Sequence, residues 1–227
     1  MARPLALRHR GSARTGVVRV ADVQAASGVL GPGVRAVIWV AGCSLRCSGC
    51  IAPGWQRSDA GADVGVDVLA KWAGEVAVDG LTLSGGEPFL QAAALSRLVR
   101  LLRTQRPGLS VMSYSGFRLE TLTERGTSEQ RALLELLDVL VDGPYVEARH
   151  RPLRWRASDN QRIHFLTPRH ADCAGELDEP AGLELAPRAE GDLLLVGVPP
   201  LAGMADTIAA GFGDGRHTTT SGSGNTT

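Results

Sequence analysis

The sequence lacks long apolar runs, and it carries no excess charge of either sign. Its longest apolar stretches, at 36–41 and 193–204, fall well short of the ~20 residues that a helix needs to cross a bilayer. Lys and Arg together number 24, as do Asp and Glu, so the formal net charge is zero. A balanced charge provides no general attraction to nucleic acid or to an anionic membrane. We therefore expect no membrane span and no nucleic-acid partner.

Cysteine is also scarce, and the four cysteines are not spread along the chain as disulfide bridges would require. Cys43, Cys47 and Cys50 lie within eight residues, and Cys173 stands apart from them. Small secreted proteins distribute their bridges through the chain, whereas crowded thiols are typical of metal sites in reducing compartments. Residues 1–19 contain no apolar segment of the kind that a secretion signal needs. These features predict a cytoplasmic metalloprotein.

The chain is long enough to bury one substantial core. It has 227 residues, of which 44% are hydrophobic, so the usual size of a domain favours one catalytic domain with appendages. The last residues are mostly Thr, Ser and Gly, which cannot bury a core. We predict an N-terminal extension at 1–15, a core domain at 16–170, a C-terminal subdomain at 171–213 and a disordered tail at 214–227.

Segments with the patterns of strands and of helices alternate through the core domain. The run 34–40 is β-branched and almost continuously apolar, as expected of a strand covered on both faces. The alternation predicts an α/β fold with a parallel sheet. We expect strands at 34–40, 81–83, 109–114 and 139–141, helices at 66–78, 89–105, 119–123 and 128–137, and beyond them a hairpin of 183–185 with 193–198 and a small helix at 201–210.

The crowded cysteines directly follow the first of these strands. Cys43-Ser-Leu-Arg-Cys47-Ser-Gly-Cys50 places three thiolates in one loop, which can fold around a corner of an iron–sulfur cube. Three thiolates bind three of the four irons of a 4Fe-4S cluster and leave the fourth iron open to a substrate. Zinc motifs usually show two pairs of ligands, and no second pair is present. The alternative is nevertheless a zinc site completed by Cys173 or by one of His150, His164 and His170.

The spacing of these cysteines resembles the signature of radical S-adenosylmethionine enzymes. Gly31-Pro-Gly-Val-Arg35 ahead of them, with Gly42 beside Cys43, is similar to the short activating enzymes of anaerobic ribonucleotide reductase, and the similarity runs from about 31 to 170. The resemblance implies an incomplete TIM-like α/β barrel with a small C-terminal appendage. It also implies that Cys43, Cys47 and Cys50 hold a 4Fe-4S cluster, and that the enzyme splits S-adenosylmethionine into methionine and a 5′-deoxyadenosyl radical.

The same resemblance implies the partners of the reaction. Flavodoxin or ferredoxin would donate the electron, and the radical would remove a hydrogen atom from a backbone glycine of a partner such as anaerobic ribonucleotide reductase. Two alternatives stay open: a radical enzyme that acts directly on a peptide or small metabolite, which the additional segment 172–212 favours, and a metal-binding module without activity. Arg149, Arg151, Arg154 and Arg156 form a candidate basic patch for an acidic surface of the partner.

Residues 84–87 are the first candidates for binding S-adenosylmethionine. Ser84-Gly85-Gly86-Glu87 lies where a strand ends and a helix begins, which is where parallel α/β folds bind their ligands. The two glycines allow the backbone to approach a ligand closely. The resemblance implies that this segment holds the amino group of the methionine moiety. It also assigns adenine contacts to the backbone at Gly49, Cys50 and Ile51, although many relatives have an aromatic residue in place of Ile51.

Two further segments follow predicted strands. Tyr114-Ser115-Gly116-Phe117 resembles the Tyr-Thr-Gly-Tyr segment that lines the S-adenosylmethionine site in the family, with Ser115 as the polar contact. The stretch 139–145 resembles Val-Leu-Val-Asp-Gly-Lys-Phe, so Asp142 is a candidate to anchor a cofactor group, although Pro144 replaces the Lys. Without the resemblance, both segments could be plain turns. The stretch 155–161 is similar to a family loop, which we expect to close the site.

Overall fold

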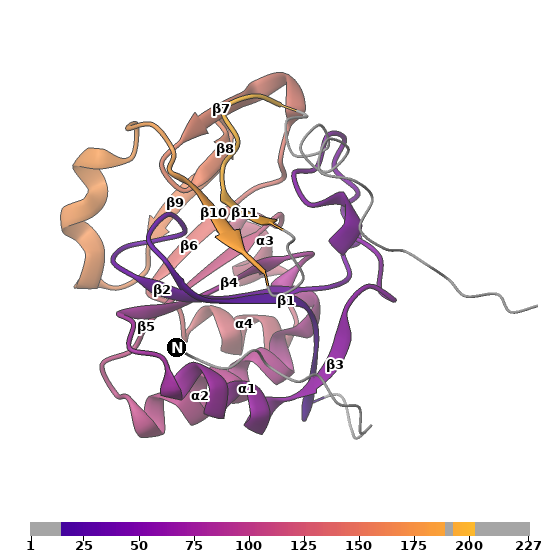
Figure 1. The fold of residues 1–227 in the computed structure, drawn as a ribbon, viewed down its shortest axis with the longest axis vertical. Helices are drawn as coiled ribbons and strands as arrows, with labels where there is room; N and C mark the ends of the chain where they lie inside the picture. The colour runs from indigo at the N-terminus through magenta and orange to yellow at the C-terminus, as the bar shows by residue number, and fades with distance from the viewer. Residues whose placement is uncertain (1–14, 189–192, 203–227) are drawn as a thin grey trace, which may run out of the picture.

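The computed structural model describes residues 15–188 and 193–202, and its centre is an open sheet of seven strands (Figure 1). The neighbours in the middle of this sheet are parallel, whereas the strands at both sides join in antiparallel directions. The predicted α/β class is therefore confirmed, but the sheet is mixed. In order across the sheet, the strands are β3 (Ala62–Gly65), β1 (Val17–Ser27), β2 (Arg35–Val40), β4 (Gly80–Gly85), β5 (Ser110–Ser115), β6 (Val139–Asp142) and β9 (Arg162–Phe165).

The sheet does not close into a barrel within the described residues, because β3 and β9 end the order of paired strands. The finer expectation of a partial barrel stays a prediction. The boundaries of the core domain and of the C-terminal subdomain also stay predictions, and residues 1–14 of the predicted extension and the tail at 214–227 lie outside the described residues.

Helices α1 (Val66–Glu75), α2 (Ala92–Gln105) and α4 (Ser128–Leu134) cover one face of the sheet (Figure 1). Short α3 (Leu119–Glu124) precedes α4, which begins at a capping box formed by Thr127 and Gln130. The helix predicted at 89–105 begins later, because Pro88–Gln91 forms a 3₁₀ turn, and α4 ends short of the predicted residue 137. No helix in the described ranges is long and apolar enough to span a membrane.

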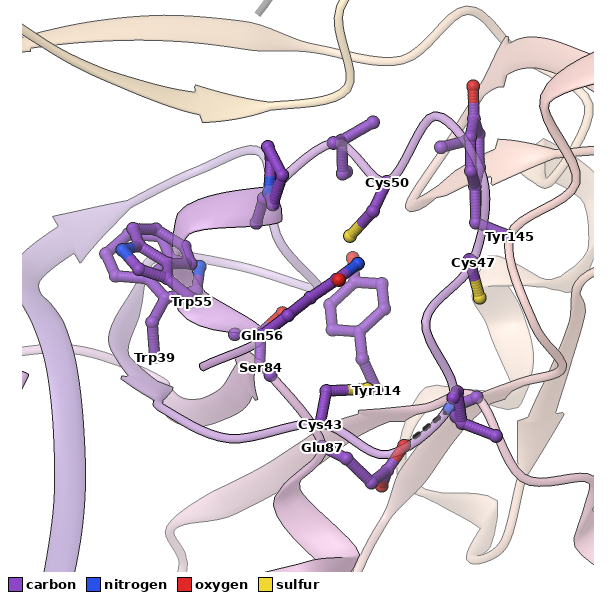
Figure 2. Close-up of a pocket in the computed structure, with 18 of the residues that line it drawn as sticks. Trp39, Cys43, Cys47, Cys50, Trp55, Gln56, Ser84, Glu87, Tyr114 and Tyr145 are labelled. Atoms are coloured by element: carbon purple, nitrogen blue, oxygen red, sulfur yellow. Dashed lines mark hydrogen bonds between the residues drawn. The ribbon is translucent and has the colours of Figure 1, made fainter. Parts of the chain in front are cut away.

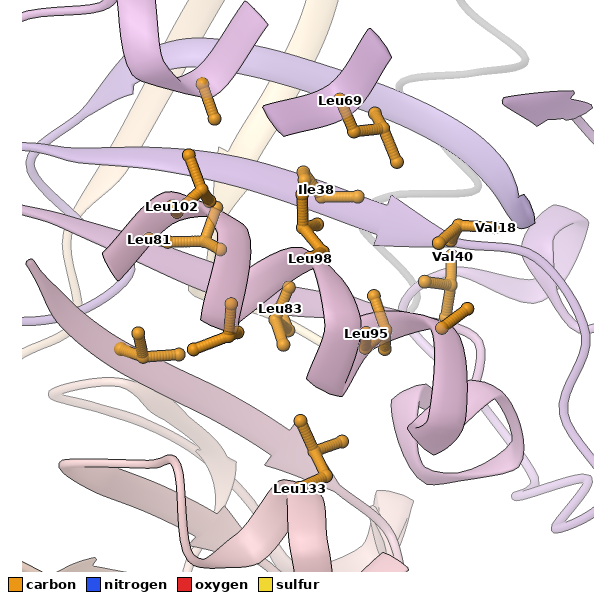
Figure 3. Packing of buried hydrophobic residues seen from close by; sticks show 14 of the residues in the cluster. Val18, Ile38, Val40, Leu69, Leu81, Leu83, Leu95, Leu98, Leu102 and Leu133 are labelled. Atoms are coloured by element: carbon orange, nitrogen blue, oxygen red, sulfur yellow. The ribbon is translucent and has the colours of Figure 1, made fainter. Parts of the chain in front are cut away.

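Side chains of β2 alternate between two cores. Ile38 and Val40 face the helices, where they join a large cluster with Leu95 and Leu98 of α2, all of them fully buried (Figure 3). Trp39 faces the other side of the sheet. Burying a leucine of this kind stabilises the fold by roughly 1.5–3 kcal/mol relative to exposure. The helix-side core therefore fixes the strands whose carboxyl ends carry the candidate site.

A hairpin covers part of the opposite face. Strands β10 (Leu183–Pro187) and β11 (Leu193–Gly197) pair in antiparallel fashion, which confirms the predicted hairpin, and Val196 packs against Trp39 (Figure 1). Residues 203–210 of the small helix predicted after it lie outside the described residues. A second small hairpin consists of β7 (His150–Leu153) and β8 (Arg156–Ser158).

Arg35 is fully buried at the amino-terminal end of the central strands. Its guanidinium donates to the Thr82 hydroxyl at 2.7 Å, to the Leu81 carbonyl oxygen at 2.8 Å and to the Pro32 carbonyl oxygen at 3.0 Å. Burial lowers the pKa of Arg35 to about 10, so the side chain is still charged at neutral pH. This cation links β2 to β4 at the end of the sheet remote from the cysteines.

Candidate metal and ligand site

A pocket of about 450 Å³ lies at the carboxyl ends of β2, β4 and β5, and all three crowded cysteines line it (Figure 2). This volume is within the range of small-molecule sites. The strand ends also bring residues 84–87 and Tyr114–Gly116 to its wall. Nine of the eleven predicted site residues line this pocket, and Gly49 and Asp142 do not. The nine are Cys43, Cys47, Cys50, Ile51, Ser84, Gly85, Gly86, Glu87 and Ser115.

The cysteine loop and the segment after β4 are joined through their backbones. The amide of Gly86 donates to the Val40 carbonyl oxygen at 2.7 Å, and the amide of Glu87 donates to the Gly42 carbonyl oxygen at 2.9 Å. A side chain at Gly86 would collide with the backbone of Gly42. On the other side of the loop, Cys43 donates its amide to the Gln56 carbonyl oxygen at 2.9 Å. The close approach therefore requires glycine at position 86.

The cysteines fit an iron–sulfur cluster better than a single zinc ion. Each is partly exposed to the pocket, and none forms a disulfide. Among the residues that the structure describes, no three His, Cys, Asp or Glu side chains surround a single-ion site. A 4Fe-4S cluster instead distributes its thiolates over separate irons. Burial raises the pKa of the Cys47 thiol, and iron binding would have to displace this proton.

The four candidate partners of the zinc alternative lie elsewhere, since the pocket lining includes none of them. Cys173 packs beside the Trp155 cluster. The His170 ring nitrogen is 2.7 Å from the Ser110 hydroxyl, at the remote end of β5, and His164 lies beside Asp142. His150 contacts the Tyr145 hydroxyl at 3.0 Å. The fourth ligand that a zinc site would need is therefore not near the three cysteines.

Glu87 is buried beneath the pocket wall and links the ends of β4 and β5. Its carboxylate accepts hydrogen bonds from the Ser115 hydroxyl at 2.9 Å, the Gly116 amide at 2.8 Å and the Phe89 amide at 3.0 Å. Burial raises the pKa of Glu87 to about 7 despite these bonds. A carboxylate offers about four acceptor positions, so about one is left for a ligand. The hydroxyl of Ser115 also accepts from the Phe117 amide, which leaves it little capacity for a ligand.

Two of the predicted contact residues, Gly49 and Asp142, do not line the pocket. Asp142 does not line it and is fully buried at the end of β6, where its carboxylate accepts from Arg162 at 3.0 Å and from the Leu119 amide at 2.6 Å. Although burial alone would raise it, these two donors and His164 hold the pKa of Asp142 below its ordinary value. Gly49 lies in the cysteine loop against the Glu147 side chain. In this structure, Asp142 therefore acts as a link between β6 and β9.

Several pocket residues were not identified from the sequence. The rings of Trp39 and Trp55 lie with centroids 5.4 Å apart on one side of the pocket (Figure 2). Trp39 lies near the end of β2, which was an available signal, whereas Trp55 lies in the 3₁₀ turn Pro53–Trp55 after the cysteines. Leu194 and Val198 reach the pocket from the C-terminal hairpin, and local sequence patterns do not predict a contact between segments so far apart in the chain.

The arginines of the candidate basic patch are mostly engaged within the chain. Arg154 pairs with Glu179 at 2.7 Å, Arg156 pairs with Asp178 at 2.7 Å, and Arg149 pairs with Asp159 at 2.5 Å. The pairs of Arg154 and Arg156 attach the segment after β9 to the β7–β8 hairpin, whereas Arg149 and Asp159 flank that hairpin and join its two ends. Three of the four arginines therefore have acidic partners within the chain, and docking of a partner protein through this patch stays a prediction.

Comparisons with known proteins agree with this site. A family model described as a 4Fe-4S single cluster domain matches residues 29–164. The chain is 33% identical over 151 residues to the anaerobic ribonucleoside-triphosphate reductase-activating protein of Vibrio cholerae serotype O1, which covers 61% of this chain and 92% of that protein. It is 31% identical over 146 residues to the protein of the same name from Escherichia coli K12, with the same shares covered. For the phage T4 protein of that name, the identity is 32% over 144 residues, with 60% and 86% covered.

Proposed function

This chain belongs to the family of anaerobic ribonucleoside-triphosphate reductase-activating proteins, and we propose that it generates a glycyl radical on an anaerobic ribonucleotide reductase by radical S-adenosylmethionine chemistry. One observation carries the proposal. Three cysteines and the segment 84–87, which the sequence separates by more than thirty positions, line one pocket and are joined by backbone hydrogen bonds. A cluster bound by the three cysteines would therefore lie beside a ligand bound at 84–87.

The residues of the pocket have separate roles in this proposal. Cys43, Cys47 and Cys50 each bind one iron and leave the fourth iron for the ligand. When bound and reduced, the cluster supplies the electron that splits S-adenosylmethionine into methionine and a 5′-deoxyadenosyl radical. Gly86 brings the backbone next to the cysteine loop, and Glu87 holds two strand ends together while keeping one acceptor position for the ammonium group of the ligand.

Two partners complete the reaction. We propose flavodoxin or ferredoxin as the electron donor, and a glycine of the reductase as the group that loses a hydrogen atom. Direct action on a peptide or small metabolite is the second candidate, because the hairpin residues Leu194 and Val198 wall part of the pocket and lie beyond the matched domain.

The proposal predicts a cluster that depends on Cys47 but not on Cys173. Anaerobically reconstituted protein should bind about four irons and four sulfides per chain. Cys47→Ala should lose most of this iron and all release of methionine and 5′-deoxyadenosine, because an iron ligand is missing. Iron and sulfide analysis, together with chromatography of the products after reduction by dithionite, measures both effects.

Cys173→Ala is the matched control, since that thiol lies outside the pocket. It should retain the cluster and the cleavage of S-adenosylmethionine. Addition of an anaerobic ribonucleotide reductase should then yield a glycyl radical by electron paramagnetic resonance. Cleavage without a glycyl radical would favour the second candidate, whereas stoichiometric zinc with no cleavage would contradict the proposal.

A further inference from the structure

The segment after β6 packs against the outer side of the cysteine loop. Gly49 has a φ of +64°, and a side chain there would collide with the Glu147 carboxylate, which packs directly on the glycine. The Ser48 hydroxyl donates to the same carboxylate at 3.3 Å. The backbone amide of Tyr145 donates a hydrogen bond to the Cys47 sulfur, and the two residues lie side by side in Figure 2. Three consecutive residues of the cysteine loop therefore contact residues 145–147.

Strand β8 and the residues after it hold this segment in place. The Asn160 side-chain amide donates to the Pro144 carbonyl oxygen at 2.8 Å, and the Val146 amide donates to the Ser158 hydroxyl at 3.3 Å. Ser158 is fully buried. Glu147 begins a 3₁₀ turn directly after these contacts. Its carboxylate therefore reaches the cysteine loop from a backbone that is fixed independently of that loop.

Glu147 places a negative charge beside the loop that would carry the cluster. Ser48 and Gly49, which it contacts, lie between Cys47 and Cys50, whose thiolates would each bind an iron. Glu147 itself does not line the pocket, so a ligand there does not need to touch it. The reduction potential of an iron–sulfur cluster depends on the surrounding charge, on hydrogen bonds to its sulfurs and on its exposure to solvent. A nearby carboxylate opposes the uptake of an electron and so lowers this potential.

We propose that Glu147 is a positioning residue for the cluster, which holds the part of the loop between Cys47 and Cys50 and lowers the reduction potential through its negative charge. The inference rests on the proposed function, which supplies the cluster. A lower potential makes the reduced cluster a stronger one-electron reductant, which favours breaking the carbon–sulfur bond of S-adenosylmethionine. The same charge makes the cluster harder for the electron donor to reduce. Glu147 therefore balances these two steps.

The substitution Glu147→Gln keeps the size of the side chain and an acceptor for Ser48, and it removes the charge. The midpoint potential of the reconstituted cluster should rise. At the midpoint of the wild type, the ratio of reduced to oxidised cluster should increase about 3- to 10-fold, and a tenfold change corresponds to 59 mV for one electron. The rise should shrink at high ionic strength, because salt screens an exposed charge. An anaerobic redox titration followed by electron paramagnetic resonance measures the potential.

The substitution Glu147→Ala tests the contact itself, because it also removes the acceptor for Ser48 and the packing against Gly49. Backbone amides of residues 47–50 should exchange with solvent about 3- to 10-fold faster in the cluster-free variant than in the cluster-free wild type. Hydrogen exchange followed by mass spectrometry measures this rate. In Glu147→Gln, the exchange should stay close to that of the wild type.

Glu135→Gln is the matched control for the charge. Glu135 is also exposed, but it lies between α4 and the start of β6, at the end of the sheet remote from the cysteines. Its substitution should leave the potential unchanged. An equal shift in Glu135→Gln and Glu147→Gln, no shift in Glu147→Gln, or unchanged exchange in Glu147→Ala would overturn the inference. If the wild-type protein bound a cluster but did not split S-adenosylmethionine, the proposed function would fall, while the potentials and exchange rates would still decide the role of Glu147.

Discussion

Glu87 is only 1% exposed, so the protonation of its carboxyl group contributes to stability. Because its pKa rises from 4.5 to about 7 on folding, the folded protein keeps a proton that the unfolded chain has released between these two values. The free energy of unfolding must then fall as the pH rises from about 4.5 to about 7, because only the folded protein holds this proton over that range. Above about pH 7, the ionised carboxylate of Glu87 lowers the free energy of unfolding by a constant amount. A shift of this size corresponds to a cost on the order of 3 kcal/mol.

Glu87→Gln should remove this pH dependence, because an amide does not titrate. Between about pH 5 and pH 8, the wild-type protein should lose on the order of 3 kcal/mol of unfolding free energy relative to the variant. The variant should be less stable at pH 5, since an amide nitrogen replaces one acceptor facing the Gly116 or Ser115 donors. Urea unfolding of the cluster-free protein at several pH values measures the difference. Parallel pH curves would show that Glu87 titrates normally.

At the scale of elements, the C-terminal hairpin depends on a close contact with the loop before β2. Gly197 has a φ of +112°, and a side chain there would collide with the Gly182 carbonyl oxygen and with Val29. Gly197→Ala should therefore cost about 1–3 kcal/mol of stability through backbone strain. It should also weaken binding of S-adenosylmethionine, because Gly197 and Val198 line the pocket. Thermal melting and equilibrium dialysis measure the two effects.

Gly108→Ala is the control for this substitution. A side chain at Gly108 would meet no atom within 4 Å, and its φ is not in the left-handed range. Its effect on stability should stay within about 0.5 kcal/mol, and its ligand affinity should equal that of the wild type. If Gly197→Ala behaved like Gly108→Ala, the hairpin would not be anchored by this contact.

The elements differ in how well their sequences predicted them. Strand β2 is buried on both faces, so its near-continuous apolar run identified it almost to the residue. Strand β1 mixes charged, polar and apolar residues and pairs with β2 through bulges, and β9 is only four half-buried residues long. Such strands are stabilised by hydrogen bonds to the adjacent strands rather than by a pattern in their own sequence. Their own patterns are too weak to predict the antiparallel sides of the sheet.

The candidate site shows the same limit. Cys43, which follows β2, and Ser84, near the end of β4, line one pocket because the ends of these two strands are adjacent. Asp142 is the last residue of β6, but its carboxylate pairs with Arg162 from the unpredicted β9 and does not line the pocket. The orientation of such a side chain depends on a tertiary contact, which periodicity and spacing do not contain.

At the scale of the whole molecule, the two faces of the sheet have cores of unequal size. The helix side buries a large continuous cluster, whereas the opposite face buries two smaller clusters, one with Trp39 and Val196 and one with Met112 and Val139. Regions with few buried contacts open at lower free energy than the main core. Backbone amides of β11 should therefore exchange with solvent about ten-fold faster or more than those of β2. Hydrogen exchange followed by mass spectrometry measures this, and equal protection would mean that both faces unfold together.

The backbone hydrogen bonds from Gly86 and Glu87 to the strand end and loop before Cys43 have a consequence for protein engineering. A designer who transplants the cysteine loop into another scaffold would transfer the thiolates without the neighbour that sets their backbone path. The unit to be transplanted is discontinuous, because it consists of residues 40–50 after β2 and residues 84–87 at the end of β4. Glycine must be retained at position 86, because the backbones of these two segments are in contact there. A scaffold that lacks two adjacent parallel strands cannot accept it.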